Sequence, residues 1–594
     1  MTFPATARTL TLAYPKWIPG EHAPTGPLSQ MVKLVFTAAG KPLSWRRDDL
    51  DMYLFHVDVP PGANQVVADM DFACIVNGDG FRSDICTSQD QLVINWWQMV
   101  LYPPALPNDR DPFTPTIRLP AGWHYSSALP VDQKENADNV IAFKTVSLKT
   151  LVDSPVIAGE HHRQIPLGGQ HPAQLDITTE TAESLNIPSE QAANFTHLVA
   201  EAEALFDGSR YEHYNLLLSL GDSIDHYTLE HLQSSENRLP DHGLSDKRIL
   251  FTTASMIPHE YIHAWNGKYR TPSGLDIKTY QDPMKAALIW VYEGLTDYYG
   301  NILAARSGFW NEDQLGQALA VDVAQMTYHT GRLWRPLQDT TVGVQMIYES
   351  PNAWSSARRN SDFYPESGLF WLEADTIIRQ QTKGQRSLDD FCKLFYGPQN
   401  GPQGKPYTFD DVVAGMNHIA PYDWKTFFHT RLDAKNPEPP LGGVENSGWK
   451  FTYTDQKSEL VEDMEQIHKI DLLWPQWEKF AFSDQRYSIG LLIQDDGTVL
   501  DSAPGMAAYS AGIMPGMQLL KINGKSFALP TLEQEIRQTK TGGSLEFDVA
   551  VGNFNSPNRL DYHDGLKYPH LERDASKPDL LKDIAAPKAA QQNH

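Results

Sequence analysis

Short runs of alternating hydrophobic and polar residues dominate the first part of the chain. They occur at residues 9–14, 32–36, 52–57 and 66–72, and clusters of Pro and Gly separate them. A period of two places successive side chains on opposite faces of an extended strand. We therefore expect a β-rich, β-sandwich-like domain over residues 1–165.

The spacing of apolar residues changes after about residue 166. Helical spacing appears in three segments, 195–206, 312–328 and 367–380. Residues 214–220 form a continuous apolar run, which is typical of a buried strand. The segment 284–306 is rich in Ala, Leu and aromatic residues with few charges, and it predicts one largely buried helix. These patterns indicate a mostly α-helical domain over residues 166–475.

A smaller module is predicted at residues 485–553. Its elements follow one another as strand (488–491), turn (511–517), strand and turn (519–525), short helix (532–538) and closing strand (544–551). Residues 554–594 form a C-terminal tail that is rich in Pro, Lys and Asp from residue 567 and that we expect to be loosely ordered at its end. The chain is thus predicted to be a multidomain α+β protein.

The strongest chemical signal is the pattern H-E-x-x-H, formed by His259, Glu260 and His263. Two histidines four residues apart lie on one face of a helix, where both rings can reach one metal ion. The carboxylate of Glu260 points at the same site, placed to take a proton from a water that the metal activates rather than to ligate. Pro258, directly before the motif, predicts that the helix either starts late or kinks there.

A third metal ligand is predicted at Glu293. This carboxylate lies in the apolar segment 284–306, and burying it without a partner is costly. A metal ion supplies that partner. Asp297, one helical turn later on the same face, is placed to accept the free ring N–H of a ligating histidine. The spacing of Glu293 and Asp297 matches the E-x-x-x-D arrangement of thermolysin-like enzymes.

These motifs resemble the glycyl aminopeptidase family of zinc metallopeptidases. The matching segments are HEYIHAWN (259–266), WVYEGLTDYYG (290–300), DFYPESGLFWLEADTIIR (362–379), SLDDF (387–391), YPKWIPGEHAPTGP (14–27) and DYHDGLKYPHLERD (561–574). The resemblance therefore runs nearly from end to end. It implies an N-terminal β-domain, a thermolysin-like (gluzincin) catalytic domain with one Zn²⁺ per chain, and a C-terminal PDZ-like domain.

Two further roles follow from the resemblance alone. Tyr364 matches the active-site tyrosine whose hydroxyl stabilises the oxyanion. Glu230 matches the glutamate that pairs with the α-ammonium of a substrate, because Leu229-Glu230-His231 fits the last three positions of the family's Gly-Gly-Leu-Glu-His segment. Tyr227 and Thr228 stand where the family has two glycines, which leaves the shape of the first subsite open.

The implied reaction is the removal of N-terminal residues, Gly or Ala by the family's name, from peptides with a free N-terminus. Two alternatives stay open. The first is a zinc endopeptidase with the same metal chemistry. The second is a catalytically silent scaffold that binds partners through its PDZ-like module, in which a groove beside a strand can capture an extended peptide. The sequence leaves the oligomeric state unknown.

Charge and composition exclude several other classes of protein. A formal net charge of −25 argues against a nucleic-acid or anionic-membrane surface, and no apolar run is long enough for a membrane span. The first residues lack a signal segment, but the family resemblance begins within the first twenty residues. We expect that a leader has been removed and that the protein is periplasmic or secreted, with a cytoplasmic location as the alternative.

Three cysteines are too few for a disulfide scaffold. Cys74 and Cys86 flank a Gly-rich turn at residues 77–80 and either pair across a hairpin or remain two thiols. Cys392 lies in an apolar helical pattern and is expected in the core.

Overall fold

A computed structural model describes the chain except for residues 6–7, 75–85, 134–138, 350–352, 402–403, 436–437, 468–481 and 590–594. It divides into two compact units. The first comprises Met1–Ile187, Tyr211–His242 and Ser273–Ala286, and the second comprises Pro188–Arg210, Gly243–Pro272 and Ala287–His594. Each unit is made of several separate segments of the chain, so the two units are not divided at residues 165, 475 and 485. The domain boundaries predicted at those residues stay predictions.

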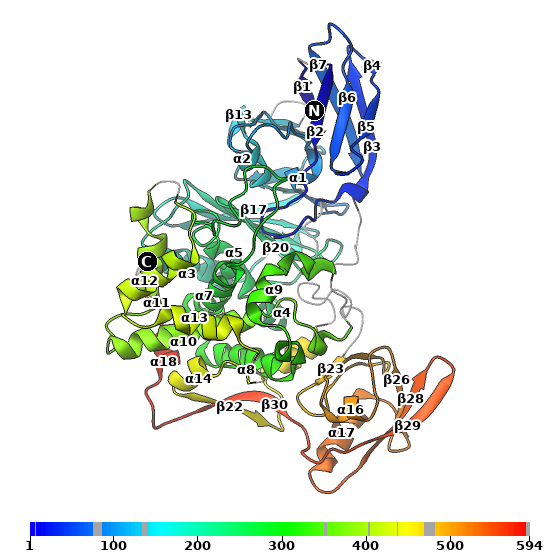
Figure 1. The fold of residues 1–594 in the computed structure, drawn as a ribbon, viewed down its shortest axis with the longest axis vertical. Coiled ribbons are helices and arrows are strands. Elements are labelled where there is room, and N and C mark those ends of the chain that lie inside the picture. The colour runs from blue at the N-terminus through cyan, green and yellow to red at the C-terminus, as the bar shows by residue number, and fades with distance from the viewer. Residues whose placement is uncertain are drawn as a thin grey trace. The chain divides into compact units, whose positions relative to one another are not determined.

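The first unit is rich in sheets (Figure 1). At the N-terminus two sheets enclose one apolar core that includes Phe36, Phe55 and Val66. The first sheet has the strand order β1 (Thr2–Pro4), β7 (Gln65–Phe72), β3 (Met31–Ala38), β4 (Lys41–Pro42). The second has the order β2 (Thr9–Ala13), β6 (Leu54–Asp58), β5 (Trp45–Arg47). The predicted strand runs thus lie on β2, β3, β6 and β7, and the N-terminal part is rich in sheets as expected.

Four further sheets complete this unit. Three of them are small. The first has the strand order β12 (His124–Ser127), β16 (Val156–Gly159), β9 (Gln91–Ile94), β8 (Cys86–Thr87), and the second has the order β11 (Thr116–Arg118), β14 (Val140–Phe143), β13 (Val131–Gln133). The third pairs β10 (Pro112–Phe113) with β15 (Val146–Ser147). The helices α1 (Trp96–Met99) and α2 (Leu148–Val152) lie between their strands in sequence. The largest sheet has the order β17 (His161–Gly168), β18 (Ala173–Thr179), β19 (Tyr214–Leu220), β21 (Ser234–Leu239) and β20 (Tyr227–Glu230). Glu230 therefore ends the edge strand β20.

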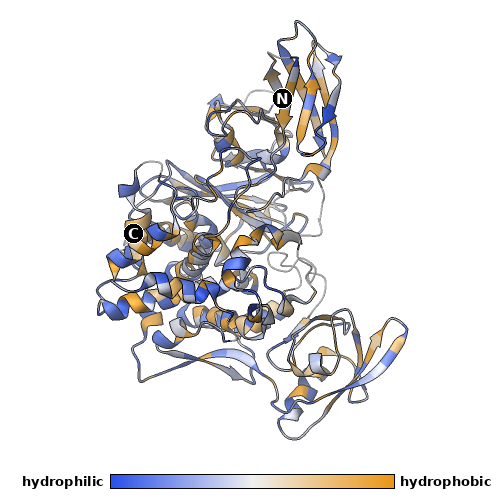
Figure 2. Cartoon of the chain, viewed as in Figure 1, coloured by the Kyte–Doolittle hydropathy of each residue, from blue (hydrophilic) through white to orange (hydrophobic). Residues whose placement is uncertain are grey.

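The second unit contains most of the helices. They are α3 (Ser189–Phe206), α4 (Lys247–Thr253), α5 (Met256–Ile262), α6 (Ile289–Tyr292), α7 (Gly294–Ser307), α8 (Glu312–Tyr328), α9 (Leu337–Val342), α10 (Pro365–Gln381), α11 (Leu388–Tyr396), α12 (Phe409–Ile419), α13 (Trp424–Asp433), α14 (Gly442–Asn446), α15 (Glu459–Gln466) and α18 (Leu580–Ala585). Most of them carry both apolar and polar residues (Figure 2). No helix among the described residues is long and apolar enough to cross a membrane.

Aromatic residues form the core behind the predicted metal helices. Trp290 of α6 stacks on Trp371 of α10 at a centroid distance of 5.6 Å and lies 4.8 Å from Phe428 of α13. Trp371 also donates its indole N–H to the Trp290 carbonyl at 3.1 Å. Because Trp290 lies three residues before Glu293, this packing fixes the segment that presents the predicted ligand.

Residues 482–560 form a β-rich module within the second unit. One sheet has the strand order β23 (Phe482–Gln485), β24 (Leu491–Gln494), β25 (Val499–Ser502). The other has the order β27 (Lys525–Ser526), β26 (Gln518–Ile522), β28 (Leu545–Val551), β29 (Phe554–Leu560). The module also contains the helices α16 (Ala507–Ser510) and α17 (Leu529–Thr539). β24 pairs with a strand on both sides, so it offers no free edge to a peptide. The PDZ-like character of the module and its capture of peptides stay predictions.

The predicted tail returns to the helical region. Its strand β30 (Tyr568–Arg573) pairs with β22 (Trp449–Thr454), and the carbonyl of Ile584 in α18 accepts a hydrogen bond from Arg306 Nε of α7 at 2.9 Å. Glu201 of α3 accepts the backbone N–H groups of Lys588 and Ala589. The residues up to 589 are therefore part of the folded core, and residues 590–594 lie outside the described part.

The cysteines carry no disulfide in the structure. Cys74 is exposed and Cys86 is buried. The Gly-rich turn at 77–80 lies outside the described residues. Cys392 is buried in α11, in agreement with the predicted core position.

Candidate metal centre

The paired histidines lie on the short helix α5 and at its end. Pro258 is the third residue of α5, where a helical N–H has no intrahelical acceptor, so the helix starts late and tolerates the proline. Thr252 and Thr253 lie in the preceding helix α4, and Ser255 occupies the N-cap position of α5. The Nε2 atoms of His259 and His263 lie 3.1 Å apart.

Glu293 lies at a break between two helices. The continuous helix predicted over 284–306 is wrong in this respect, because α6 begins only at Ile289 and Glu293 separates α6 from α7. The break leaves the main-chain hydrogen bonds in place, since Glu293 N bonds to Ile289 O and Asp297 N bonds to Glu293 O, both at 2.7 Å. Glu293 is 3% exposed, and its Oε2 lies 3.2 Å from His259 Nε2 and 3.3 Å from His263 Nε2.

These three atoms fit the donor set of one metal ion. Ligands about 2.0–2.1 Å from a tetrahedral metal lie about 3.3–3.4 Å from one another, close to the 3.1–3.3 Å found here. The Nδ1 of His263 donates to the Asn266 carbonyl at 2.8 Å, so its Nε2 carries a lone pair towards the site. Burial acts to lower the pKa of His259, but the hydrogen bond with Glu293 and the charges of Glu260 and Glu293 together raise it. The site therefore favours a bound cation.

Asn266 joins the two segments that carry the candidate ligands, although no sequence pattern singled it out. Its Nδ2 donates to the carbonyls of Val291 and Tyr292 and to Thr296 Oγ1, at 2.9–3.1 Å. Its Oδ1 accepts the hydroxyls of Tyr396 at 2.7 Å and Tyr407 at 3.3 Å. A single buried amide thus fixes the chain just before Glu293, while the carbonyl of the same residue orients His263.

The predicted base and tyrosine come from the same unit as the three ligands. Glu260 lies on α5 between the two histidines and is 7% exposed. Tyr364 precedes α10, and its ring centroid lies 6.0 Å from that of His259. The two side chains therefore belong to the surroundings of the metal ligands, as H-E-x-x-H and the family resemblance predict, and their chemical roles stay predictions.

Asp297 lies in the first turn of α7, one helical turn after Glu293. Burial raises its pKa to about 6, with a further contribution from Glu293, whereas His259 acts in the opposite direction. The backbone N–H of Asp297 donates to the Glu293 carbonyl at 2.7 Å. Among the described contacts there is no hydrogen bond between Asp297 and the ring of His259, so the predicted support of a ligating histidine stays a prediction.

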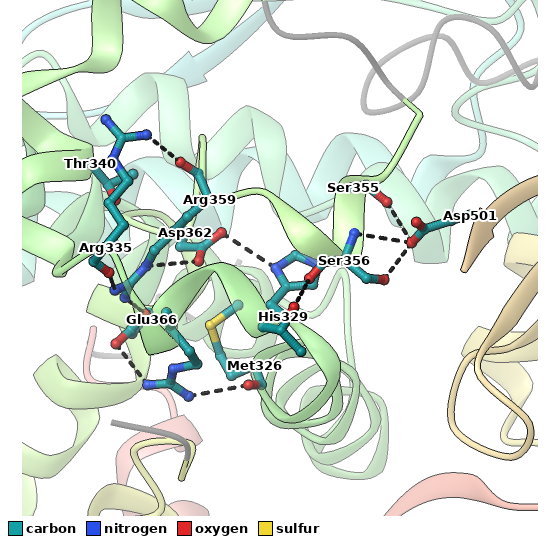
Figure 3. Close-up of polar contacts among 12 residues, drawn as sticks. Met326, His329, Arg335, Thr340, Ser355, Ser356, Arg359, Asp362, Glu366 and Asp501 are labelled. Atoms are coloured by element: carbon teal, nitrogen blue, oxygen red, sulfur yellow. Dashed lines mark hydrogen bonds and ion pairs between the residues drawn. The ribbon is translucent and has the colours of Figure 1, made fainter. Parts of the chain in front are cut away.

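Glu366, two residues after Tyr364, is held by two buried guanidinium groups (Figure 3). Arg332 donates to its Oε1 at 2.9 Å, and Arg359 pairs with its Oε2. Arg359 also donates from Nε to Asp362 Oδ2 at 3.0 Å. Asp362 and Glu366 flank Tyr364 in sequence, so this network fixes the chain on both sides of the tyrosine.

Glu230 belongs to the first unit, where it is 3% exposed at the end of β20. Gly20 lies against its carboxylate. Gly20 has φ +89°, and a Cβ atom placed on it would lie 2.7 Å from Glu230 Oε2 and 2.5 Å from Leu229 Cδ1. The absence of a side chain at Gly20 therefore leaves the room that this carboxylate occupies. Its amine-binding role stays a prediction.

The fold of the chain is similar to that of a protein of known structure. The crystal structure of an aminopeptidase N family protein from Idiomarina loihiensis is similar to the chain with a TM-score of 0.78 at 17% identity, over 99% of this chain and 97% of that one. An M1 zinc metallopeptidase from Deinococcus radiodurans has a TM-score of 0.42 at 14% identity, over 74% of this chain and 90% of that one. The first similarity shows a shared fold. No curated protein matches the chain.

Two family models match the sequence itself. The Peptidase M61 N-terminal domain matches residues 1–160, and the M61 glycyl aminopeptidase matches residues 252–370, which include the three candidate ligands, Glu260 and Tyr364. These matches define a peptidase. Both matches are to models of the M61 glycyl aminopeptidase family, which confirms the resemblance seen in the motifs of the chain.

Gly294, next to the ligand Glu293, provides a test of the metal centre. A Cβ atom at Gly294 would lie 2.1 Å from Ser367 Cβ and 3.0 Å from the Phe363 carbonyl. We expect Gly294→Ala to displace Glu293 and weaken metal binding about 10–100-fold, as changes beside metal ligands commonly do. Competition with a chelator, followed by elemental analysis, measures this loss.

Gly316 is the matched control. It lies in helix α8, and a Cβ atom there meets nothing within 4 Å. Gly316→Ala should leave metal affinity unchanged and stabilise the fold by about 0.4–1 kcal/mol. Equal metal affinity in the two variants would contradict the close packing beside Glu293.

Proposed function

We propose that this peptidase is a zinc-dependent aminopeptidase. The observation that carries the proposal is the convergence of His259 Nε2, His263 Nε2 and Glu293 Oε2, which lie 3.1–3.3 Å from one another. Two imidazoles and one carboxylate with an open fourth position are the ligand set of catalytic zinc sites. We expect one Zn²⁺ per chain.

A bound zinc ion would supply Lewis-acid chemistry, because it acidifies a water molecule and polarises the peptide carbonyl. Glu260 accepts the proton of the attacking water and delivers it to the leaving amine. Tyr364 donates its hydroxyl to the oxyanion of the tetrahedral intermediate. The ring of Tyr364 lies beside that of His259, which supports this assignment.

Glu230 is proposed to bind the free α-ammonium of the substrate. Its carboxylate is buried, and a buried carboxylate favours a cationic partner over an uncharged one. An anchor of this kind sets the number of residues between the amine and the cleaved bond, and so makes the enzyme an exopeptidase. The proposed preference for small N-terminal residues such as Gly or Ala rests on the family name.

Replacement of the base should separate metal binding from turnover. We expect Glu260→Gln to keep its zinc and to lose about 10²–10⁴-fold in kcat, because the amide cannot accept the proton. His263→Ala should lose zinc and activity together, since it removes a ligand. Zinc content by elemental analysis and kcat on a Gly- or Ala-peptide substrate give both results. Near-normal turnover of Glu260→Gln would refute its role as base.

Removal of the tyrosine hydroxyl should act on the transition state. We expect Tyr364→Phe to lower kcat about 10²–10³-fold with little change in KM, as the loss of one oxyanion donor does. Steady-state kinetics on the same substrate measure both constants. A variant that raises KM and leaves kcat unchanged would place Tyr364 in substrate binding instead.

Blocked and free peptides test the ammonium anchor. An enzyme that uses Glu230 should cleave a free peptide at least about 10-fold better than its N-acetylated form, since a hydrogen bond to a charged group contributes about 1.5–3 kcal/mol. Equal rates would favour the endopeptidase. Gly20→Ala, which crowds Glu230, should reduce this preference, whereas Gly62→Ala should not. Gly62 has a similar φ of +86°, but a Cβ atom there meets nothing within 4 Å.

A further inference from the structure

A carboxylate of the C-terminal module binds a short helix that leads to Tyr364 (Figure 3). Asp501, on β25, accepts the hydroxyl of Ser355 at 2.8 Å and the backbone N–H of Ser356 at 3.1 Å. The hydroxyl of Ser356 donates to the same oxygen, Oδ2. The two serines begin the 3₁₀ helix η5 (Ser355–Ala357), so three donors from one end of this helix meet one carboxylate oxygen.

This contact is fully removed from water. Asp501 and Ser356 both have 0% exposure. The other carboxylate oxygen of Asp501 accepts the Ser502 N–H at 2.9 Å, and Arg486 NH1 lies 3.6 Å from Oδ2. A buried carboxylate is costly unless its hydrogen bonds are made, so the position of η5 relative to β25 is strongly determined.

The segment after η5 carries this constraint to Tyr364. Arg359 follows two residues after the end of η5 and binds both Asp362 and Glu366, which flank Tyr364. His329 Nδ1 lies 3.4 Å from Asp362 Oδ1. Met326 and Arg335 bind the guanidinium groups of this network through their backbone carbonyls. A displacement of η5 therefore moves the segment that ends at Tyr364.

The module is also joined to the helical region by an apolar core and a second ionic contact. Ala324 and Tyr328 of α8 pack in one cluster with Ile489, Leu491 and other residues of the module. Lys457, before α15, pairs with both Glu465 and Glu533, the latter on α17 of the module. The module therefore packs against the helical region through several contacts, of which the contact with η5 is one.

We propose that Asp501 is a positioning residue for Tyr364, through which the C-terminal module supports the reaction. Asp501 would act by holding η5, and the bonds of Arg359 would transmit that position to the tyrosine. The inference rests on the proposed role of Tyr364 in the reaction. It assigns the module a function within the enzyme that does not depend on capture of a peptide.

The test removes the donors on η5 and leaves the module intact. Of the three donors on η5, only the backbone N–H of Ser356 still reaches Asp501 in Ser355→Ala/Ser356→Ala. We expect kcat to fall about 10–100-fold, as a small misplacement of a catalytic group does, with KM within about 3-fold of the parent value. Zinc content should be unchanged. Asp501→Asn should also lower kcat. In either orientation of the amide, its NH₂ group replaces one acceptor oxygen and faces either the three donors of η5 or the backbone N–H of Ser502.

Asp496→Asn is the matched control within the same module. Asp496 is exposed and accepts the backbone N–H of Thr498 at 2.8 Å within its own turn. This variant should keep the parent kcat and KM. Thermal unfolding of all variants identifies any whose lower kcat reflects a smaller folded fraction, and kcat is then expressed per folded, zinc-loaded enzyme.

A double-mutant cycle with Tyr364→Phe distinguishes positioning from a general structural role. If the serines act through the tyrosine hydroxyl, their replacement should lower the kcat of Tyr364→Phe less than about 3-fold, because the affected interaction is already gone. An equal fold-change in both backgrounds, or an unchanged kcat in the parent background, overturns the inference. If Tyr364→Phe alone keeps the parent kcat, the proposed role of Tyr364 has failed instead.

Discussion

The structure depends on three hydrogen-bond acceptors that meet in a buried space. Two imidazole nitrogens and a carboxylate oxygen that lie 3.1–3.3 Å from one another favour a cation between them. Asn266 fixes the chain before Glu293, and the Nδ1 bond of His263 sets the direction of its other nitrogen. The protein therefore holds the three proposed ligands in place in advance, an arrangement that would favour metal binding.

Close packing between helices gives this site its dimensions. Gly300 of α7 faces α5, where an added Cβ atom would lie 3.2 Å from His259 Cβ. Gly294 similarly faces Ser367 of α10 at the turn that follows Glu293. Small residues at these two contacts allow three helices to approach, and the stacked Trp290 and Trp371 fill the space behind them. Apolar packing thus determines where the polar ligands lie.

The sequence predicted the local parts of this arrangement well. The periodicity of residues 195–206, 214–220 and 312–328 corresponds to α3, β19 and α8, because their packing faces follow simple repeats. H-E-x-x-H and Glu293 identified the convergent donors, since a buried carboxylate needs a partner. Periodicity could not show the break at Glu293, because the main-chain hydrogen bonds continue through it. Nor could it reveal Asn266, whose five partners come from distant segments, or the contact of Asp501 with η5.

The C-terminal segment that follows the module packs against the helical region, and this affects folding during translation. Arg306 and Ile584 are hydrogen-bonded although they lie 278 residues apart in sequence, and β30 supplies the only partner of β22 in their two-stranded sheet among the described strands. Domains commonly fold as they emerge from the ribosome, from the N-terminal end onward. The helical region cannot complete its packing in this way, because α18 and β30 emerge after the module. The helices that carry the proposed metal ligands therefore reach their final surroundings only after almost the whole chain has been translated.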